Sequence, residues 1–284
     1  MGLLTAVLWG ITDVLVGINA RAVGVKKAVY FAQTLGFVVM SLLLLAFPAI
    51  ILKPLTAPLS VWLLAVGAAM LTVFGALALS KAFALGKASI IAPVVTSYGV
   101  VTTLLSWASG EQISSAQLAC ITVCVVGVTL SSRHKDSTLP HHTTPTRSIG
   151  YALLAAALYG TSFWLQAKYT LPLLGTVTTL WLGYLVGISM LLLIVLNVPN
   201  GLKIPPLKNC IALTGVSLAN LAGFSAYAYG TTVGSVSVVT VISTLSGGVA
   251  AVLSFMFFRE RLAAIQVVGV LLVLGGAFAL HVYR

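Results

Sequence analysis

Two stretches of the sequence decide the fold, because they repeat one pattern 149 residues apart. Residues 110–127 read GEQISSAQLACITVCVVG, and residues 259–276 read RERLAAIQVVGVLLVLGG. A glutamate, a glutamine and a glycine recur at matched positions: Glu111 with Glu260, Gln117 with Gln266, and Gly127 with Gly276. Similarity of a chain to itself at a fixed offset indicates an internal duplication. We therefore expect two related halves.

The composition identifies the solvent in which these halves fold. Of the 284 residues, 60% are hydrophobic and 7% are charged, whereas a soluble domain carries about 25% charged residues. Even a domain of about 300 residues leaves roughly a quarter of its unfolded surface in water. A polytopic membrane protein is therefore expected. Soluble enzymes, nucleic-acid-binding proteins, disordered tails and disulfide scaffolds are excluded.

Ten apolar runs have the length of about 20 residues that crosses a bilayer as a helix. They cover residues 2–19, 28–47, 59–80, 88–107, 114–131, 148–168, 174–196, 209–230, 235–258 and 262–281. The runs are continuously apolar, without the alternation of a membrane β-barrel. The predicted fold is all-α, with a five-helix repeat over residues 1–131, a polar linker over 132–147 and a second five-helix repeat over 148–284.

The odd number of spans in each half predicts that the repeats are inverted, because the second half then enters the membrane from the opposite side. Residues 8–10 (LWG) match residues 158–160 (LYG), and Gly86 matches Gly234. Inverted repeats are typical of secondary transporters, whose substrate site lies near the membrane midplane between the halves.

Three features of the sequence carry a family resemblance. They are residues 8–10, the Glu-Gln-Gly pattern that closes each half, and the stretch AFALGKASIIAP at residues 82–93. With them the whole chain resembles the EamA-like branch of the drug/metabolite transporter superfamily. The resemblance implies ten helices and alternating access for a small metabolite. It leaves the substrate open among amino acids, sugars, nucleotide conjugates and cations.

The sequence departs from that family pattern at two places. Thr240-Val241 stands where the first half has Ala92-Pro93, so one half lacks a helix-weakening proline. Asp13 lies near the middle of the first span and is not a general feature of the family.

Asp13 is the leading candidate for a substrate-binding residue. A charge at the centre of a membrane helix costs roughly 2.5–3.5 kcal/mol on insertion scales, so the carboxylate should face a cavity or a partner. Trp9 lies one helical turn earlier on the same face. A carboxylate beside an aromatic ring suits an organic cation or an amino group. The alternative is an aspartic acid bonded to Thr12 or to a neighbouring helix.

The duplication extends this candidate site to the second half. The repeat mates of Trp9 and Asp13 are Tyr159 and Phe163, so the sixth span would add aromatic walls without a second carboxylate. Trp9 and Tyr159 could instead belong to an interfacial aromatic belt. Three further candidates are Tyr98, which follows Pro93, and Asn220 and Tyr227 on one face of the eighth span; Asn220 could instead hold helices together.

A second group of residues is expected to act in gating or in the structure. It comprises Pro93, Glu111, Glu260, Gly247 and Gly248. The two glutamates precede the last span of each half, where acidic side chains favour a helix N-terminus. Pro93 frees a backbone carbonyl, as in the broken helices that line transporter cavities. The alternative is that Thr96 and Ser97 satisfy the backbone there. The two glycines are the expected weak point of the ninth span, or else positions that permit close helix packing.

The sequence therefore predicts a secondary transporter for a small polar or amphiphilic metabolite, with an amine or amino acid as candidates, in the plasma (inner) membrane. No catalytic triad, phosphate-binding loop or zinc spacing occurs, so no enzyme activity, metal or cofactor is expected. The expected partners are a small-molecule substrate and the lipid bilayer, with proton coupling as an option and no nucleic acid, in a monomer or homodimer. Two alternatives stay open: a carrier of neutral or anionic metabolites that uses Asp13 for proton coupling, and a non-transporting scaffold or lipid-handling protein.

The membrane orientation receives two conflicting predictions. The odd-numbered loops hold 12 lysines and arginines, and the remaining loops with the C-terminus hold 3. The positive-inside rule then places both termini outside the cytoplasm, whereas the family resemblance implies that both lie inside.

Overall fold

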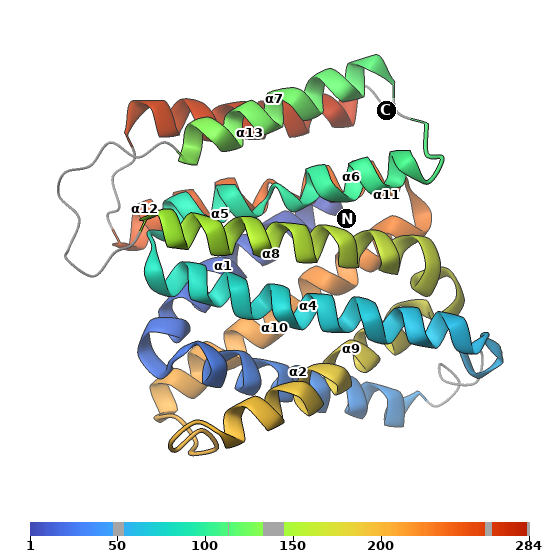
Figure 1. Cartoon of the computed structure of the whole chain (residues 1–284), viewed down its shortest axis with the longest axis vertical. Coiled ribbons are helices and arrows are strands. Elements are labelled where there is room, and N and C mark those ends of the chain that lie inside the picture. Colours follow the sequence, from blue (N-terminus) through green and yellow to red (C-terminus); the bar gives the residue numbers. More distant parts are fainter. Residues whose placement is uncertain (48–53, 113, 133–144, 259–262, 283–284) are drawn as a thin grey trace.

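The computed structural model describes residues 1–47, 54–112, 114–132, 145–258 and 263–282, and these residues form helices and short turns without a strand (Figure 1). The first half contains α1 (Gly2–Val23), α2 (Val25–Ala46), η1 (Pro54–Thr56), α4 (Leu59–Leu85), α5 (Ala88–Val95), α6 (Tyr98–Ala108) and α7 (Ser115–Ser132). The second half contains α8 (Pro145–Leu165), η2 (Gln166–Thr170), α9 (Leu171–Leu196), α10 (Leu207–Val233), α11 (Val236–Ser243), α12 (Ser246–Phe258) and α13 (Ala264–Val282). The all-α prediction is confirmed.

Seven helical stretches in the described part of the chain are long and apolar enough to cross a membrane. One of them, Thr146–Leu196, has 51 residues, which at 1.5 Å per residue is more than two bilayer cores of about 30 Å. It turns at Gly175, whose φ of 72° lies in the region that favours glycine. The stretch therefore supplies two spans, while the total of ten stays a prediction.

The outside of the bundle carries large apolar side chains, as expected for a surface in contact with lipid. Several are more than half exposed: Leu42, Leu45, Leu59, Leu193, Leu207, Ile211 and Phe257. A soluble monomer rarely exposes so much contiguous apolar surface, so this surface fits a protein embedded in the membrane.

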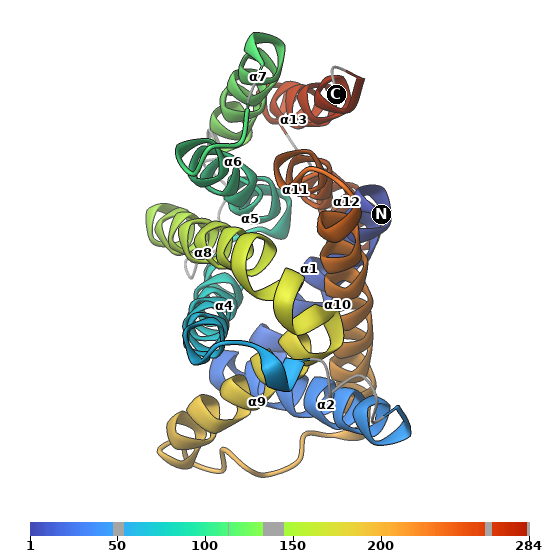
Figure 2. The same ribbon diagram turned by 90° about the vertical axis from the view of Figure 1, so that its right-hand side faces the viewer.

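The helices of the two halves pack in equivalent ways. α1 packs on α10 and α12, and its repeat mate α8 packs on α4 and α6. Two further pairs join mates directly, α2 with α9 and α7 with α13. Figure 2 shows these pairs at opposite edges of the bundle. The pairing is that of two repeats related by a twofold rotation.

The broken helices give the relative direction of the repeats. α5 is followed by α6 and packs on α12, whereas α6 packs on α11, which precedes α12. The beginning of one broken helix thus lies against the end of the other. The two segments run antiparallel, as inverted repeats require.

The ninth span breaks at a different point from the one predicted. The first half is interrupted at Thr96–Ser97, and the second is interrupted at Thr244–Leu245, before Gly247. Hydroxyl groups bond back to carbonyls at both breaks: Thr96 Oγ1 donates to Pro93 O at 2.6 Å, and Thr244 Oγ1 donates to Val241 O at 2.5 Å. Such bonds compete with the regular helix and bend it, and the second break forms without a proline.

Gly247 instead allows the two breaks to cross closely. A Cβ atom at Gly247 would lie 2.7 Å from Thr96 Cγ2 and 3.0 Å from Ala92 O. At the equivalent position, a Cβ atom at Gly99 would lie 2.5 Å from Thr244 Cγ2. Gly248 is also buried, within α12. Both halves therefore need a glycine where the broken helices meet.

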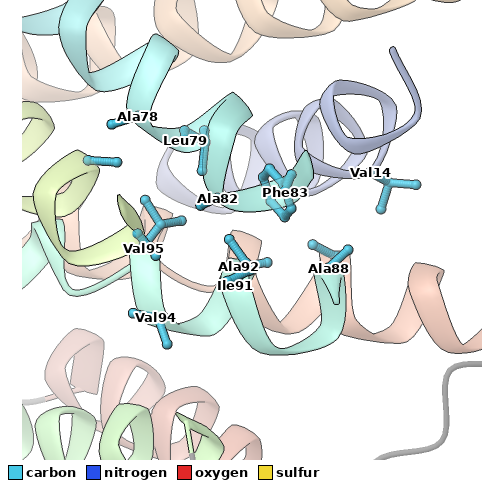
Figure 3. Close-up of a cluster of buried hydrophobic side chains, with 13 residues drawn as sticks. Val14, Ala78, Leu79, Ala82, Phe83, Ala88, Ile91, Ala92, Val94 and Val95 are labelled. Carbon is cyan, nitrogen blue, oxygen red and sulfur yellow. The ribbon is translucent and has the colours of Figure 1, made fainter. Parts of the chain in front are cut away.

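Small side chains support the same close approach at the core beside α5. Figure 3 shows Ala78, Leu79, Ala82 and Phe83 of α4 facing Ala88, Ile91, Ala92 and Val95 of α5. Membrane helices associate through packing of small residues, because lipid supplies no hydrophobic driving force between them. This core packs α4 and α5 beside Val14 of α1, and through Ala152 and Ala155 of α8 it also joins the two halves.

Candidate functional site

A cavity lies among helices of both halves. Its lining includes six of the seven predicted binding residues: Trp9, Asp13, Tyr98, Tyr159, Phe163 and Asn220. The cavity has a volume of about 100 Å³, several times the 10–15 Å³ that one buried water needs. The cavity extends toward the end of the bundle where α1 ends and α2 begins, because Asn19 and Ala28 also line it.

Asp13 lies on the cavity wall with 6% of its surface exposed. Thr12, the neighbour that could have bonded to it, donates instead to Leu8 O at 2.9 Å. No other residue in the described part of the chain forms a hydrogen bond or ion pair with the Asp13 carboxylate. The cavity lining within that part contains no lysine, arginine or histidine, so the acidic group faces a space without a cation.

Aromatic rings from both halves form the wall beside Asp13. The Trp9 and Phe163 rings are stacked, with centroids 5.3 Å apart and an interplanar angle of 12°. The Phe163 and Tyr159 rings stack in the same way at 5.7 Å. Gly223 makes room for the indole, because a Cβ atom there would lie 2.6 Å from Trp9 Cδ1. The Trp9 Nε1 donor is buried without a hydrogen-bond partner.

Tyr98 and Tyr227 occupy different positions relative to the cavity. Tyr98 lines it, and its hydroxyl lies 2.9 Å from Ser243 Oγ. Tyr227 does not line it: its ring centroid lies 5.0 Å from that of Phe163, and its hydroxyl bonds to Thr240 Oγ1 at 2.8 Å. The predicted contact of Tyr227 with substrate is thus not supported, because a neighbouring helix already satisfies its hydroxyl group.

Two cavity residues, Gln33 of α2 and Tyr184 of α9, were not among the predicted binding residues. Together with Asn220 they line both the central cavity and a second cavity. The second cavity also reaches Ala65 and Gln166, near the start of α4 and the end of α8, and so extends toward the other end of the bundle. The repeat could have revealed this pair, because Gln33 and Tyr184 occupy equivalent positions three residues before Gly36 and Gly187.

Glu111 links the two halves rather than capping the helix that follows. Its carboxylate accepts a hydrogen bond from Ser235 Oγ, at the residue that precedes α11. The start of α7 is capped by Ser114 and Gln117 instead: Gln117 N donates to Ser114 Oγ at 3.2 Å, and Ser114 N donates to Gln117 Oε1 at 2.8 Å. This reciprocal pair is a capping box. Glu260 lies outside the described residues.

Fold and cavity together define a helical, multi-pass membrane protein built from two inverted repeats around a central cavity. The sequence profile of the EamA-like transporter family matches residues 1–133 and 146–281, and the chain belongs to that family. Members of the family are transporters rather than enzymes, so the protein is a membrane transporter of small molecules.

A solved protein crystal structure has the same fold. It superposes with a TM-score of 0.72 over 99% of this chain and 96% of the other chain, at 16% sequence identity. None of the curated proteins compared with the chain matches it.

Proposed function

We propose that this protein is a secondary active transporter of a small organic cation, an amine, and that the ammonium group binds at Asp13. The observation that carries the proposal is the cavity itself: one carboxylate, no cation among its described lining residues, and walls of Trp9, Tyr159 and Phe163. Such a site attracts positive charge and repels anions.

The energetics favour a cationic ligand over a neutral one. Both the carboxylate of Asp13 and a free ammonium group lose hydration in the membrane interior, and breaking such a buried pair costs about 3–5 kcal/mol. The Trp9 face can add a cation–π interaction of about 2 kcal/mol when the cation is desolvated. A neutral ligand would leave the carboxylate unpaired.

The two cavities support alternating access as the transport mechanism. They extend toward opposite ends of the bundle and share Gln33, Tyr159, Tyr184 and Asn220 in their walls. Inverted repeats can expose one central site to either side by rocking against each other. We place this cycle in the plasma (inner) membrane, in a monomer or homodimer, with proton exchange at Asp13 as the alternative coupling role.

One observation favours a second candidate function, lipid handling. An apolar groove between α2, α9 and α10 is lined by residues that include Met40, Leu43 and Val177. Leu180 lines both this groove and the second cavity. A lipid tail in the groove could therefore reach the interior from the side.

Counterflow of labelled alkylamines into proteoliposomes tests the proposal. Asp13→Asn keeps the side-chain shape and removes the charge, so it should lower amine binding and uptake by about a hundredfold or more, as expected for a lost pair of about 3–5 kcal/mol. Asp13→Glu should restore part of the activity.

Three outcomes would contradict amine transport. Amine uptake by the Asp13→Asn protein at the wild-type rate would show that the charge is dispensable. A second outcome is that the wild type takes up a neutral sugar and that a pH gradient drives this uptake, whereas the Asp13→Asn protein takes up the sugar without responding to the gradient. This outcome would favour proton coupling. Lipid scrambling at equal rates in both proteins, without amine uptake, would favour lipid handling.

A further inference from the structure

Gln33 and Tyr184 occupy equivalent positions in the two halves and are held in equivalent ways. The Tyr184 ring lies against Gly36, where an added Cβ atom would collide with the ring. Gln33 lies against Gly187, where an added Cβ atom would be 3.0 Å from Gln33 Cδ. Each polar side chain thus fits into the space that the glycine of the other half leaves open.

Each of the two side chains has a buried oxygen without a full hydrogen bond. Gln33 Oε1 and the Tyr184 hydroxyl have no hydrogen-bond partner, and Tyr184 is only 6% exposed. The Asn220 side chain lies close enough to the Tyr184 hydroxyl for a weak hydrogen-bonding contact, but not at the distance and angles of a full hydrogen bond. An unsatisfied buried polar group costs about 1–3 kcal/mol, so these two oxygens favour a ligand group that supplies the missing hydrogen bonds, with cavity water in its place when no ligand is bound.

Both side chains line the central cavity that Asp13 and Trp9 also line. A ligand whose ammonium group binds Asp13 can therefore extend toward α2 and α9 within one continuous space. Gln33 and Tyr184 also line the second cavity, so they stand where the two cavities adjoin.

We propose that Gln33 and Tyr184 form a second anchor of the substrate site, which binds a neutral hydroxyl or amide group carried by the amine substrate. This inference rests on the proposed function, because the ammonium group is held at Asp13. The ligand group would donate to Gln33 Oε1 and accept from the Tyr184 hydroxyl, and a hydroxyl or an amide can do both. The substrate class is then an amino alcohol or an amino amide.

A carboxylate fits this anchor poorly. An anionic group cannot donate to Gln33 Oε1, and the described cavity lining offers it no cation. The broken helices also offer few free N–H groups, because Ser97 N, Gly99 N, Leu245 N and Gly247 N are already bonded to carbonyls across the breaks. The anchor therefore discriminates against zwitterionic amino acids.

Calorimetric binding to the full-length protein in nanodiscs tests this anchor. The probes are linear amino alcohols from aminopropanol to aminohexanol, each compared with the alkylamine and the amino acid of the same chain length. The best amino alcohol should bind about tenfold more tightly than its alkylamine, the effect of satisfying buried polar groups, and the amino acid should bind more weakly than both.

Conservative variants identify the residues responsible. Tyr184→Phe removes one oxygen and keeps the ring against Gly36, and Gln33→Met keeps the length of the chain. Each should reduce the tenfold preference for the amino alcohol to about twofold or less. Tyr229→Phe is the matched control, because Tyr229 is 53% exposed on α10, and it should keep the full preference.

The outcomes separate this inference from the proposed function. Equal binding of amino alcohol and alkylamine by the wild type would overturn the anchor, and so would a preference that survives in both variants. Tighter binding of the amino acid would also overturn it. If the wild type binds no alkylamine, or if Asp13→Asn binds it normally, the amine site fails and the anchor fails with it.

Discussion

The two halves share their glycines at the points where helices turn or cross, but they differ in the side chains that face the cavity. Equivalent pairs of glycines at these points include Gly24 with Gly175, Gly36 with Gly187, and Gly99 with Gly247. Three equivalent pairs of cavity residues differ: Trp9 with Tyr159, Asp13 with Phe163, and Gln33 with Tyr184.

This difference separates the requirements of the fold from those of the ligand. A twofold arrangement of helices brings the same backbones together twice, so each close approach needs a small residue in both halves. A small organic substrate has no such symmetry, and its charged end needs only one carboxylate. The comparison therefore predicts that changes at paired glycines affect folding, whereas changes at Asp13 and Gln33 affect binding.

The largest effect on folding is expected where the broken helices cross. Gly247→Ala would press a methyl group against the backbone of Ala92 and Pro93 as well as Thr96, so it should lower the free energy of unfolding by about 3 kcal/mol, the upper range for overpacking. Gly99→Ala meets only the Thr244 methyl group at close range and should cost about 1 kcal/mol.

Unfolding of both variants in mixed detergent micelles measures this difference. Gly67→Ala is the control, because a Cβ atom there has no neighbour within 4 Å and Gly67 lies inside α4. Equal losses for Gly247→Ala and Gly99→Ala would show that the two crossings are energetically symmetric, against our expectation.

An effect smaller than that of Gly247→Ala, and of the same size at both positions, is expected at the two turn glycines. Gly24 has a φ of 86° and Gly175 has a φ of 72°, and neither has a neighbour within 4 Å of an added Cβ atom. Alanine at either position is strained only by the backbone, at a cost of about 2 kcal/mol. The same unfolding measurement should give matching losses for Gly24→Ala and Gly175→Ala, and a loss at one position alone would break the symmetry.

Much of this arrangement could be predicted from the sequence because it depends on local pattern. The apolar runs and the repeated Glu-Gln-Gly spacing indicated an all-helical membrane protein with two halves. The placement of Asp13, Trp9, Tyr159 and Phe163 along one cavity wall agrees with the helix spacing and the repeat offset. Their role in substrate binding remains a proposal.

The remaining features depend on contacts between distant helices. Tyr184 reaches the cavity only because α2 and α9 cross at Gly36, and a hydropathy pattern does not contain that register. Tyr227 does not line the cavity, and its hydroxyl bonds to Thr240 of another helix. The break before Gly247 coincides with the bond from the Thr244 hydroxyl group to Val241 O, whereas the sequence argument attributed helix weakness to proline and glycine.

Helix capping offers a further comparison of the halves, with an effect of about 1 kcal/mol. Ser114 and Gln117 form the capping box of α7, whereas Ala263 precedes α13 at the equivalent position, three residues before Gln266. Ser114→Ala should lower the free energy of unfolding by about 1 kcal/mol, and Ala263→Ser should raise it by a similar amount. Thermal unfolding of both variants would show opposite shifts, and shifts of the same sign would contradict the capping argument.

The smallest effect is expected at Pro93, because the second half breaks without a proline. Val241 occupies the equivalent position, and Thr244 Oγ1 bonds to its carbonyl just as Thr96 Oγ1 bonds to that of Pro93. Pro93→Val should therefore leave the break in place and change the free energy of unfolding by less than about 1 kcal/mol, within the range of volume-conserving core substitutions. Amine uptake should change by less than about twofold.

Thr96→Val is the matched variant, since it removes the hydroxyl bond that both breaks share and keeps the side-chain shape. It leaves the Pro93 carbonyl without its hydroxyl donor and should cost about 1–3 kcal/mol. If Pro93→Val has the larger effect on uptake, the proline is the hinge of the first half, and the two breaks work by different mechanisms. If Thr96→Val has the larger effect, the hydroxyl bond rather than the proline is what the two halves have in common.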